Sequence, residues 1–464
     1  MQQSVTASRL AMMVALALPG PAFADEGDLA RLRAEMAALR AQYETRLAEL
    51  EREVEALAAQ PSATAPAPAP APMGGARPAG ASAFNPEVSL VLNGRYRHAE
   101  ALEEPGITGF VKGGHGHEGE AHGDARRGFL LDESELVLAA NVDHLFRGQL
   151  NLALVDETVE VEEAWIQTLA LGHGATAKAG RFLSGIGYAN GQHPHAWDFA
   201  DPALMYVALF GEHGSYAQDG LQLSWVAPLE QWVEMGIELG RGSAFPGTER
   251  DRNGLGATAA FVRTGGDVGD SSSWRAGLSW LGTRAHERES HFEDAVSEEE
   301  VAGAFSGTSR MWIVDALWKW APDGNPAARH LTLQAEAFRR VERGDLACVE
   351  DETPACADIG MGDYRTRQWG GYVQGVYQFR RGWRAGLRFD RLSTGTIDYG
   401  AASERLERPD FSPTRTSLML DWSPSEFSRL RLQYARDRSV EAVTDHQWTL
   451  QYVMSLGAHP AHAF

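Results

Sequence analysis

From residue 87 onward, apolar and polar residues alternate along the chain in blocks of about ten residues, and short polar turns separate the blocks. In one block, Leu387 and Phe389 are apolar, whereas Arg388 and Asp390 are charged. A β-strand points successive side chains to opposite faces, so each block presents one apolar and one polar face. The pattern predicts an all-β fold in which the two faces of every strand meet different surroundings.

The alternating blocks number about sixteen, and their connections alternate between short and long. We expect strands near 87–98, 129–142, 147–156, 160–170, 175–184, 218–227, 231–241, 255–264, 273–283, 310–320, 330–341, 368–380, 383–394, 412–422, 427–438 and 446–456. Short connections are expected at 143–145, 172–174, 228–230, 381–382 and 424–426, and longer ones near 99–128, 184–217, 284–309, 342–367 and 395–411. Short turns alternating with longer external loops are typical of an antiparallel barrel in a membrane. We therefore predict an all-β transmembrane barrel of about 16 antiparallel strands over residues 87–464.

Tryptophan and tyrosine residues lie mostly near the ends of these predicted strands, on or near the apolar face. Examples are Trp225, Trp232, Trp312, Trp422 and Tyr452. Amphipathic aromatic rings concentrate at the two lipid–water interfaces of membrane proteins. A soluble sandwich would bury its aromatic side chains without preference for strand ends, so their positions favour the bilayer.

The first 24 residues have the features of a secretory signal peptide. Arg9 precedes the apolar run 10–18, and small residues at 22 and 24 flank Phe23 before the expected cleavage site. The sequence after this segment contains no run of about 18 apolar residues, so no membrane-spanning helix is predicted. An exported chain of this kind crosses a membrane as a closed barrel, so we expect it in the bacterial outer membrane.

Residues 25–60 and 61–86 differ in composition from the predicted barrel. Apolar residues in the first segment follow steps of three and four between charged residues, which predicts a periplasmic coiled coil that holds several copies together. We expect a homotrimer that barrel contacts also join. A single amphipathic helix resting on the barrel is the alternative. The second segment is rich in Ala-Pro and predicts an extended linker.

If the apolar faces meet lipid, the polar faces line the interior of the barrel, which should hold water at this size. The expected pore-lining residues are Lys178, Glu234, Glu238, Arg384, Arg388, Asp390, Arg429 and Arg431. The four arginines would form a basic patch opposite acidic groups, or would simply solvate the lumen. The acidic residues of the external segments favour cations at the mouth whereas the arginines favour anions, so the ion preference stays open.

The third external connection, 184–217, is unusually apolar for a loop. A long loop with many Trp, Phe and Leu residues should not lie in water, so we expect it to fold into the lumen and narrow the pore. The residues expected in this constriction are His193, His195, Trp197, Asp198 and Asp201.

In this layout the chain resembles the sixteen-stranded porins, whose third loop forms the constriction, and the phosphate-selective porin family most of all. The shared features are a signal, a helical stretch before a barrel of about this length, and a Gly180-Arg181-Phe182 strand end that enters the third loop. The resemblance implies a passive outer-membrane channel. The lysine-rich path of that family has no counterpart among the three scattered lysines. Near the C-terminus Pro460 and His462 interrupt the alternation before Phe464, so the last strand is expected to stop near Leu456.

Histidines and cysteines suggest two further features. His115, His117, Glu118 and His122 cluster in the first long loop, and imidazole with carboxylate is a donor set suited to zinc or another divalent cation. The alternatives are a solvated loop there, and hydrogen bonds that pin the constriction at His193 and His195. No other cofactor is expected. Two cysteines close together in an exported protein predict a loop disulfide, with a thiolate metal site as the alternative; they are Cys348 and Cys356.

Passive diffusion of small hydrophilic solutes or ions is the function that these features favour. A net charge of −21 argues against nucleic acid as a partner, and leaves the lipid bilayer and lipopolysaccharide as expected partners. One alternative is a receptor for metal ions or chelates, which needs a globular plug that the segment before the barrel does not supply. Another is a barrel hydrolase, but no serine nucleophile motif lies near the histidines. We therefore expect no enzymatic activity.

Overall fold

The computed structural model describes residues 86–101, 106–111, 127–155, 158–211, 214–249, 251–296, 300–349 and 362–457. The chain divides into two compact units, Met1–Pro78 and Ala79–Phe464, and all of the described residues belong to the second. The predicted signal peptide, coiled coil and nearly all of the linker lie outside the described residues, as does the terminal Phe464.

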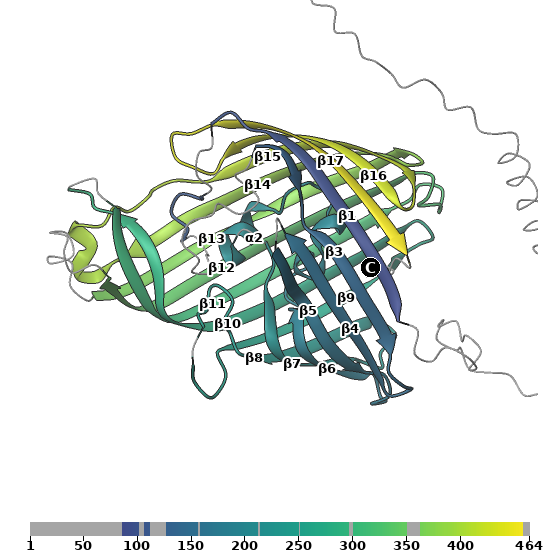
Figure 1. The fold of residues 1–464 in the computed structure, drawn as a ribbon, viewed down its shortest axis with the longest axis horizontal. Helices are drawn as coiled ribbons and strands as arrows, with labels where there is room; N and C mark the ends of the chain where they lie inside the picture. Colours follow the sequence, from purple (N-terminus) through teal and green to yellow (C-terminus); the bar gives the residue numbers. More distant parts are fainter. Residues whose placement is uncertain are drawn as a thin grey trace, which may run out of the picture. The chain divides into compact units, whose positions relative to one another are not determined.

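The described strands form one antiparallel sheet that closes on itself (Figure 1). They are β1 (Glu87–His98), β2 (Gly128–Leu131), β3 (Ser134–Asn141), β4 (Phe146–Val155), β5 (Thr158–Thr168), β6 (Ala175–Leu183), β7 (Ala217–Val226), β8 (Trp232–Gly240), β9 (Ala257–Val268), β10 (Ser272–Glu293), β11 (Glu300–Trp320), β12 (His330–Cys348), β13 (Gly362–Arg380), β14 (Trp383–Asp398), β15 (Thr414–Ser425), β16 (Ser428–Arg438) and β17 (Asp445–Gly457). Each strand from β3 to β16 pairs with the next strand in the sequence, and β1 pairs with both β2 and β3. The barrel closes because β17 pairs with β1 over ten residue pairs, Ser89↔Gly457 to His98↔Trp448. The fold is therefore a closed barrel with no free sheet edge.

The barrel has sixteen strand positions, because β2 and β3 share one of them. β2 pairs with the later part of β1, and β3 pairs with its earlier part. The single strand expected at 129–142 is interrupted at Asp132 and Glu133, where the Asp132 amide donates to the Asn93 carbonyl at 2.9 Å. Sixteen antiparallel positions confirm the predicted barrel, and β17 ends at Gly457, close to the expected end near Leu456.

Five neighbouring strands are longer than expected, which corrects the positions predicted for the external loops. β10 to β14 contain 22, 21, 19, 19 and 16 residues. Most of the expected loop 284–309 and half of the expected loop 342–367 are therefore strand. Beyond the barrel these extensions pack an apolar cluster of their own on the inner face, formed by Ala285, Val301, Phe305, Leu346, Tyr364, Tyr399, Ala402 and Leu406.

The alternation does not predict the extensions because, along them, the inward face becomes apolar and the outward face becomes polar. In β14, Leu387 and Phe389 are 51% and 43% exposed, whereas Arg388 and Asp390 are 2% and 0% exposed. Leu392 continues the inner face of the same strand, is apolar and is 0% exposed. The strand continues unbroken through this exchange, and only its surroundings change.

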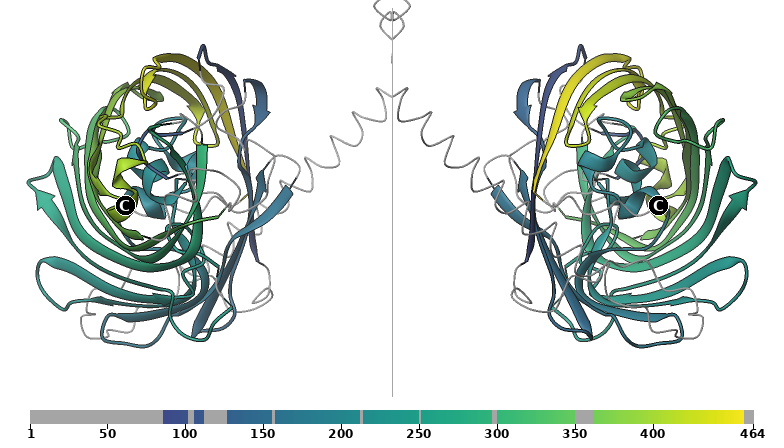
Figure 2. Two further views of the ribbon diagram at one scale, coloured as in Figure 1. Left: turned by 90° about the vertical axis from the view of Figure 1, so that its left-hand side faces the viewer. Right: turned by 90° about the vertical axis from the view of Figure 1, so that its right-hand side faces the viewer.

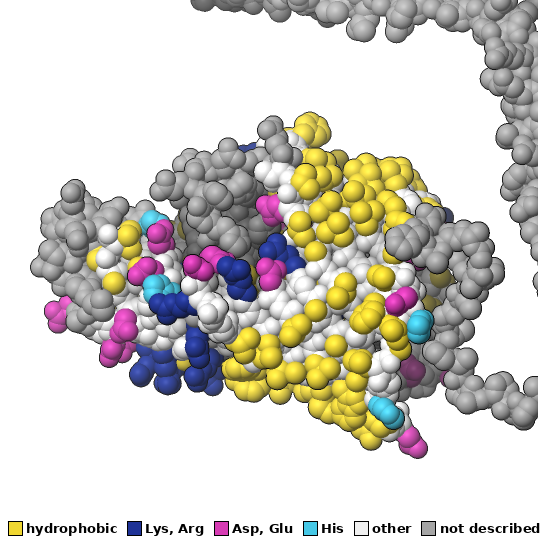
Figure 3. Space-filling view, turned by 60° about the horizontal axis from the view of Figure 1, so that its bottom comes forward, with side chains coloured by type: hydrophobic (Ala, Val, Ile, Leu, Met, Phe, Trp, Pro, Cys, Tyr) yellow, Lys and Arg dark blue, Asp and Glu magenta, His cyan; other side chains and the backbone are white. Residues whose placement is uncertain are grey.

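Over the barrel itself, the surface is inverted relative to that of a soluble protein. Large apolar side chains such as Leu221 and Val373 are 59% and 53% exposed, whereas the polar Gln451 is 1% exposed. Figure 3 shows the exposed apolar side chains as a band, with charged and histidine side chains gathered beyond its two ends. An apolar belt around a polar interior is typical of a barrel that lipid surrounds.

The chain between β6 and β7 folds into the barrel and carries three short helices. They are η1 (Ala189–Gly191), η2 (Pro194–Ala196) and α2 (Leu204–Phe210), whereas η3 (Gly400–Glu404) follows β14. α2 lies against β13 and β14 and within the ring of strands (Figure 2). Leu204, Met205 and Leu209 of α2 are buried in an apolar cluster that includes wall residues Met311 and Ile313. None of the helices in the described ranges is long and apolar enough to cross a membrane.

Candidate functional site

We call residues 184–211 and 214–216 the inner segment; the two residues between these ranges lie outside the described residues. The segment leaves the wall after Leu183 and returns at Ala217, where these two residues pair in the sheet. Between these points it contacts the wall through several groups of polar side chains. This is where the sequence predicted the constriction, and all five of the residues predicted for it lie in the segment.

The first contact is at Glu238 of β8, a predicted pore-lining residue that is 0% exposed. Its carboxylate accepts hydrogen bonds from the Ser184 hydroxyl at 2.6 Å and the Gly185 amide at 2.7 Å. Two wall amides, from Gln218 and Gln222, also donate to it at 2.7 Å. Glu238 therefore faces inward, and its oxygens hold the start of the inner segment.

The second contact is at Glu336 of β12, which is 2% exposed. Its carboxylate accepts from the backbone amides of Tyr188 and Ala189 at 2.9 and 3.0 Å, and from the hydroxyls of Tyr206 and Tyr372 at 2.7 and 2.6 Å. Four donors on one buried carboxylate compensate its loss of hydration.

Glycine is required next to this second contact. Gly187 has a φ of +65°, in the left-handed region, and a Cβ there would collide with the Tyr206 hydroxyl and the Glu336 carboxylate. The sequence around residue 187 thus allows the chain to approach the wall closely enough for both backbone amides to reach Glu336.

The third contact brings the predicted arginines together with acidic residues of the inner segment. Arg384 of β14 pairs with Asp198 at 2.7 Å and with Asp421 of β15 at 2.6 Å. Arg431 of β16, which is fully buried, donates to the carbonyl of Trp197 at 2.8 Å. Carboxylates and carbonyls therefore occupy the guanidinium groups of these arginines.

Asp201 is held by two guanidinium groups. Arg388 of β14 and Arg415 of β15 each lie 2.9 Å from its carboxylate, and Gln433 of β16 donates to it at 2.6 Å. Burial opposes ionisation of Asp201, but the two arginines outweigh burial and hold the pKa of this carboxyl well below its usual range. Arg388 also pairs with Asp390 at 3.0 Å. Asp201 is therefore an anion that ties the inner segment to three strands, β14, β15 and β16.

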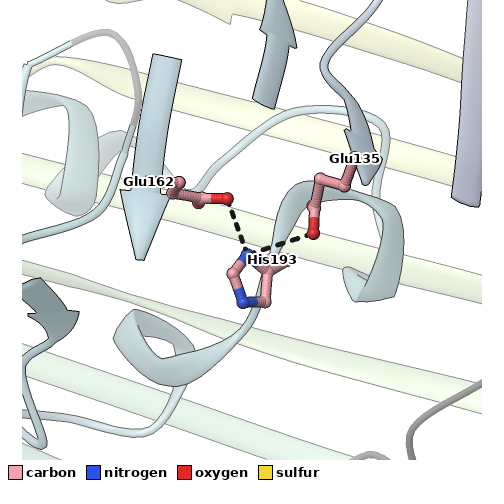
Figure 4. A group of neighbouring side chains, drawn as sticks. All are labelled: Glu135, Glu162 and His193. Atoms are coloured by element: carbon pink, nitrogen blue, oxygen red, sulfur yellow. Dashed lines mark hydrogen bonds and ion pairs between the residues drawn. The ribbon is translucent and has the colours of Figure 1, made fainter. Parts of the chain in front are cut away.

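On the other side of the inner segment, His193 and His195 face carboxylates, and Figure 4 shows His193 with Glu135 and Glu162. His193 Nδ1 lies 3.0 Å from Glu162 of β5 and 3.5 Å from Glu135 of β3, and its Nε2 lies 3.3 Å from Glu163. His195 Nδ1 lies 2.8 Å from Glu135, and the two imidazole rings are stacked with centroids 5.9 Å apart. Since Arg429 donates to the carbonyl of His195, this residue links the acidic wall to the basic wall.

A β-bulge explains why two consecutive glutamates reach the same imidazole. Asn151 pairs with Glu163 while the next residue, Leu152, pairs with Val161, so Glu162 is an extra residue in β5. A bulge breaks the strict alternation of faces and redirects the extra side chain. Glu162 and Glu163 therefore both contact His193.

The charge state of His193 bears on what this cluster can bind. Burial disfavours the imidazolium, but Glu162 and Glu135 more than offset burial and raise the pKa of His193 well above its ordinary value. Ligand atoms of Glu135, Glu162 and His193 all lie within 4.8 Å of one another, an arrangement that could hold a metal ion. Because a metal binds neutral imidazole, a cation and the His193 proton compete for the same nitrogen.

The interior also contains a cavity of about 1180 Å³ between the inner segment and the wall, reaching the short turns after β9 and β11. Its charged lining comprises Asp198, Glu234, Arg263, Asp267, Asp270, Arg275, Lys319 and Arg384. Of the predicted pore-lining residues, Glu234 and Arg384 line this cavity. Lys178 of β6 instead places its ammonium 4.7 Å from the centroid of the Trp165 ring.

The other predicted sites fall largely beyond the described ranges. His115, His117, Glu118 and His122 lie outside the described residues, so the first histidine cluster stays a prediction. Cys348, at the end of β12, is disulfide-bonded, and Cys356 lies outside the described residues.

The wall residues that hold the inner segment include several that the sequence did not single out as sites, among them Glu162, Glu163, Glu336 and Arg415. The alternation within their strands places Glu336 and Arg415 on the inward face, but it does not indicate which residues they contact. Glu162 has the outward parity and becomes an inner residue through the bulge alone. No pattern within a single strand identifies a bulge that depends on pairing with β4.

Comparison with solved structures gives barrels of outer-membrane proteins. OmpT of Vibrio cholerae is 12% identical with a TM-score of 0.47, covering 82% of this chain and 100% of that one. OprB of Pseudomonas putida is 13% identical with a TM-score of 0.46, covering 80% of this chain and 94% of that one. An anion-selective porin from Comamonas acidovorans is 10% identical with a TM-score of 0.47, covering 80% of this chain and 99% of that one. All these TM-scores are below 0.5, so the fold is taken from the strand pairing of this chain itself.

No protein-family model matches the sequence. A protein of Aquifex aeolicus, described only as uncharacterized, is 31% identical over 410 residues, which are 83% of this chain and 81% of that protein. Identity at this level over most of both chains shows common ancestry. The chain belongs to the same protein family as this Aquifex aeolicus protein.

Proposed function

We propose that the protein is a channel of the bacterial outer membrane through which small hydrophilic solutes or ions diffuse passively. The observation that carries this proposal is the closed barrel whose apolar residues face out and whose charged residues face in, as Leu387 and Arg388 do. Hydrocarbon would surround the outer face, and the charged cavity of about 1180 Å³ would hold water and solute. The inner segment would set the width of the path.

Groups of charges of opposite sign lie on different parts of the wall. Arg384, Arg388 and Arg431 lie on β14 and β16, whereas Glu135 and Glu162 lie on β3 and β5. Opposite charges on two walls create a transverse field, which orients and selects dipolar or charged solutes. We further propose that three copies assemble through the coiled coil and barrel contacts.

The purified protein, incorporated into a planar lipid bilayer, is expected to give discrete conductance steps. A salt gradient across the same bilayer gives the reversal potential, whose sign reports whether cations or anions pass preferentially. Substeps in groups of three would support the trimer. A protein that stays soluble without detergent, or that inserts without conducting, would contradict the channel. A receptor would bind its metal chelate without such steps, and a hydrolase would release product from phospholipid or peptide.

A second proposal concerns divalent cations. The convergence of Glu135, Glu162 and His193 supports binding of zinc or a similar cation inside the barrel, because imidazole and carboxylate are ligands that zinc accepts. The cation would join β3, β5 and the inner segment at one point. Binding would therefore change the width or the charge of the path next to His193.

Zinc ions are expected to lower the conductance of the wild-type channel more than magnesium ions at equal concentration. Magnesium screens charge as zinc does but prefers oxygen ligands. The difference between the conductance decreases that the two ions cause therefore measures binding through imidazole. His193→Ala should abolish the difference, whereas His144→Ala, in the exposed turn after β3, should preserve it. Deletion of 113–124 tests the first histidine cluster separately. Equal effects of the two ions on the wild type would contradict the proposal.

A further inference from the structure

Four arginines lie side by side on the outer surface of β11 to β14, just beyond the apolar band. They are Arg310, Arg339, Arg367 and Arg391, and all four are exposed. The register places them on neighbouring strands: Arg310 and Arg367 both pair with Val341 of β12, and Arg339 is two residues from Val341 on the same face. We call these four residues the arginine row.

Within the part of the chain that the structure describes, the arginine row has no counter-charge. Across the strands, its members pair with Gly282, Val341, Trp312, Trp369, Thr396, Gly371 and Thr414, none of which is acidic. Among the described residues, no carboxylate forms an ion pair with any member of the row. Four neighbouring positive charges without carboxylates repel one another, so an anion bound from outside would stabilise this face.

Further from the band the same face continues with balanced charge. Arg343 and Arg365 pair directly across β12 and β13. The next outward pair is Asp345 and Asp363, which supplies negative charge beside them. The uncompensated charge is therefore concentrated in the arginine row, at the edge of the apolar band.

Two exposed tryptophans fix the level of the arginine row relative to lipid. Trp312 and Trp369 flank Arg339 in register on either side, and they are 52% and 53% exposed. Exposed tryptophans at the end of an apolar band mark the boundary between hydrocarbon and headgroups. The arginine row therefore lies at the depth of lipid phosphates.

Immediately on the hydrocarbon side of the arginine row is an apolar groove of about 470 Å³. Small residues make its floor, since Ala316, Ala337 and Gly371 stand where other parts of the band carry large side chains. Its sides include Val314 and Phe389, and Arg391 lies on its rim. The groove thus places a surface for hydrocarbon directly beside unpaired positive charge.

We infer that this face binds a phosphorylated lipid of the outer leaflet, with phosphate on the arginine row and an acyl chain in the groove. Guanidinium groups bind phosphate oxygens in a bidentate manner, and lipid-facing small residues accommodate a chain. The lipopolysaccharide expected from the sequence is a lipid of this chemistry. The inference rests on the proposed function only in requiring a membrane around the barrel.

Affinity for a phosphorylated lipid A, measured by native mass spectrometry of the detergent-solubilised protein, tests the inference. The double variant Arg339→Gln/Arg391→Gln is expected to bind it at least about tenfold more weakly than the wild type, because charge-assisted hydrogen bonds to phosphate are lost. The matched control Arg380→Gln/Arg381→Gln removes two exposed arginines from the turn between β13 and β14, at the other end of the barrel, and should bind as the wild type does.

Three further measurements separate the contributions of phosphate and acyl chain to the affinity. Dephosphorylated lipid A should bind wild type and double variant equally, and inorganic phosphate alone should not compete at the concentration of the lipid. Ala337→Leu, which fills the groove from its exposed floor, should weaken binding while the strand content stays unchanged by circular dichroism.

Equal affinity of the wild type and the double variant for the phosphorylated lipid would overturn the inference. So would a double variant that loses its oligomeric state while its lipid affinity is retained, since a second copy would then cover this face. Bilayer conductance of the double variant should equal that of the wild type. Loss of lipid binding and failure of the channel proposal are therefore distinguishable.

Discussion

Deletion of residues 186–213 is expected to raise the single-channel conductance severalfold. The deletion joins Gly185 to Gly214, and the pairing of Leu183 with Ala217 in the sheet leaves the wall intact. It removes α2 and the side chains that fill the interior beside β13 and β14, so the path widens to the wall itself. Planar-bilayer recordings of the deletion variant and the wild type at the same salt concentration measure the change.

The same deletion should also shift the ion preference towards anions. Asp198 and Asp201 are lost, while their partners Arg384, Arg388 and Arg415 stay on the wall without these counter-charges. A shift of the reversal potential in the direction of anion preference is the expected result. Circular dichroism provides the control that the strand content is retained. Unchanged conductance in a folded variant would mean that the inner segment does not limit the path.

Replacement of Glu336 by Leu is expected to detach the centre of the inner segment from the wall. Two tyrosine hydroxyls and two backbone amides, at Tyr188 and Ala189, lose a buried acceptor, and each group left unsatisfied costs about 1–3 kcal/mol. The amide hydrogens of Tyr188 and Ala189 should exchange roughly a hundredfold faster than in the wild type, which corresponds to about 3 kcal/mol of lost protection. Hydrogen–deuterium exchange with mass spectrometry measures this directly.

Two variants serve as controls for Glu336→Leu. Glu336→Gln keeps one acceptor oxygen and should show a smaller increase in exchange. Glu426→Leu replaces an exposed glutamate in the turn between β15 and β16, and should leave the exchange of Tyr188 and Ala189 unchanged. If Glu336→Leu and Glu426→Leu behave alike, the four hydrogen bonds do not hold the segment.

The fold could be predicted because strand alternation is a local property. A period of two is visible in the sequence of each strand, and it placed β4 and β17 within about two residues of their observed limits. The same rule underestimated β10 to β14, because the expected apolar outer face ends where the membrane ends. Beyond that level, residues such as Leu392 point inward and Arg391 outward, a pattern of a sheet in water.

The sequence predicted which residues line the candidate site, but it did not predict which of them contact one another. The alternation identified Arg384, Arg388 and Arg431 as inward-facing, and the apolar loop identified the inner segment. Which carboxylate meets which guanidinium depends on the path of a loop that folds across the interior, so the pair of Arg388 with Asp201 has no signature in either strand. The bulge at Glu162 depends in the same way on a neighbouring strand.

The unequal strand lengths have a consequence for how a solute arrives. β3 to β8 contain 8 to 11 residues, whereas β10 to β14 contain 16 to 22 and enclose an apolar cluster with a buried pair of Arg288 and Glu342 at 2.8 Å. One side of the barrel entrance is therefore bounded by the long strands β10 to β14, and the other side by the ends of the short strands β3 to β8. A diffusing solute meets the long strands as a wall on one side, so it enters at an oblique angle from the side of the short strands.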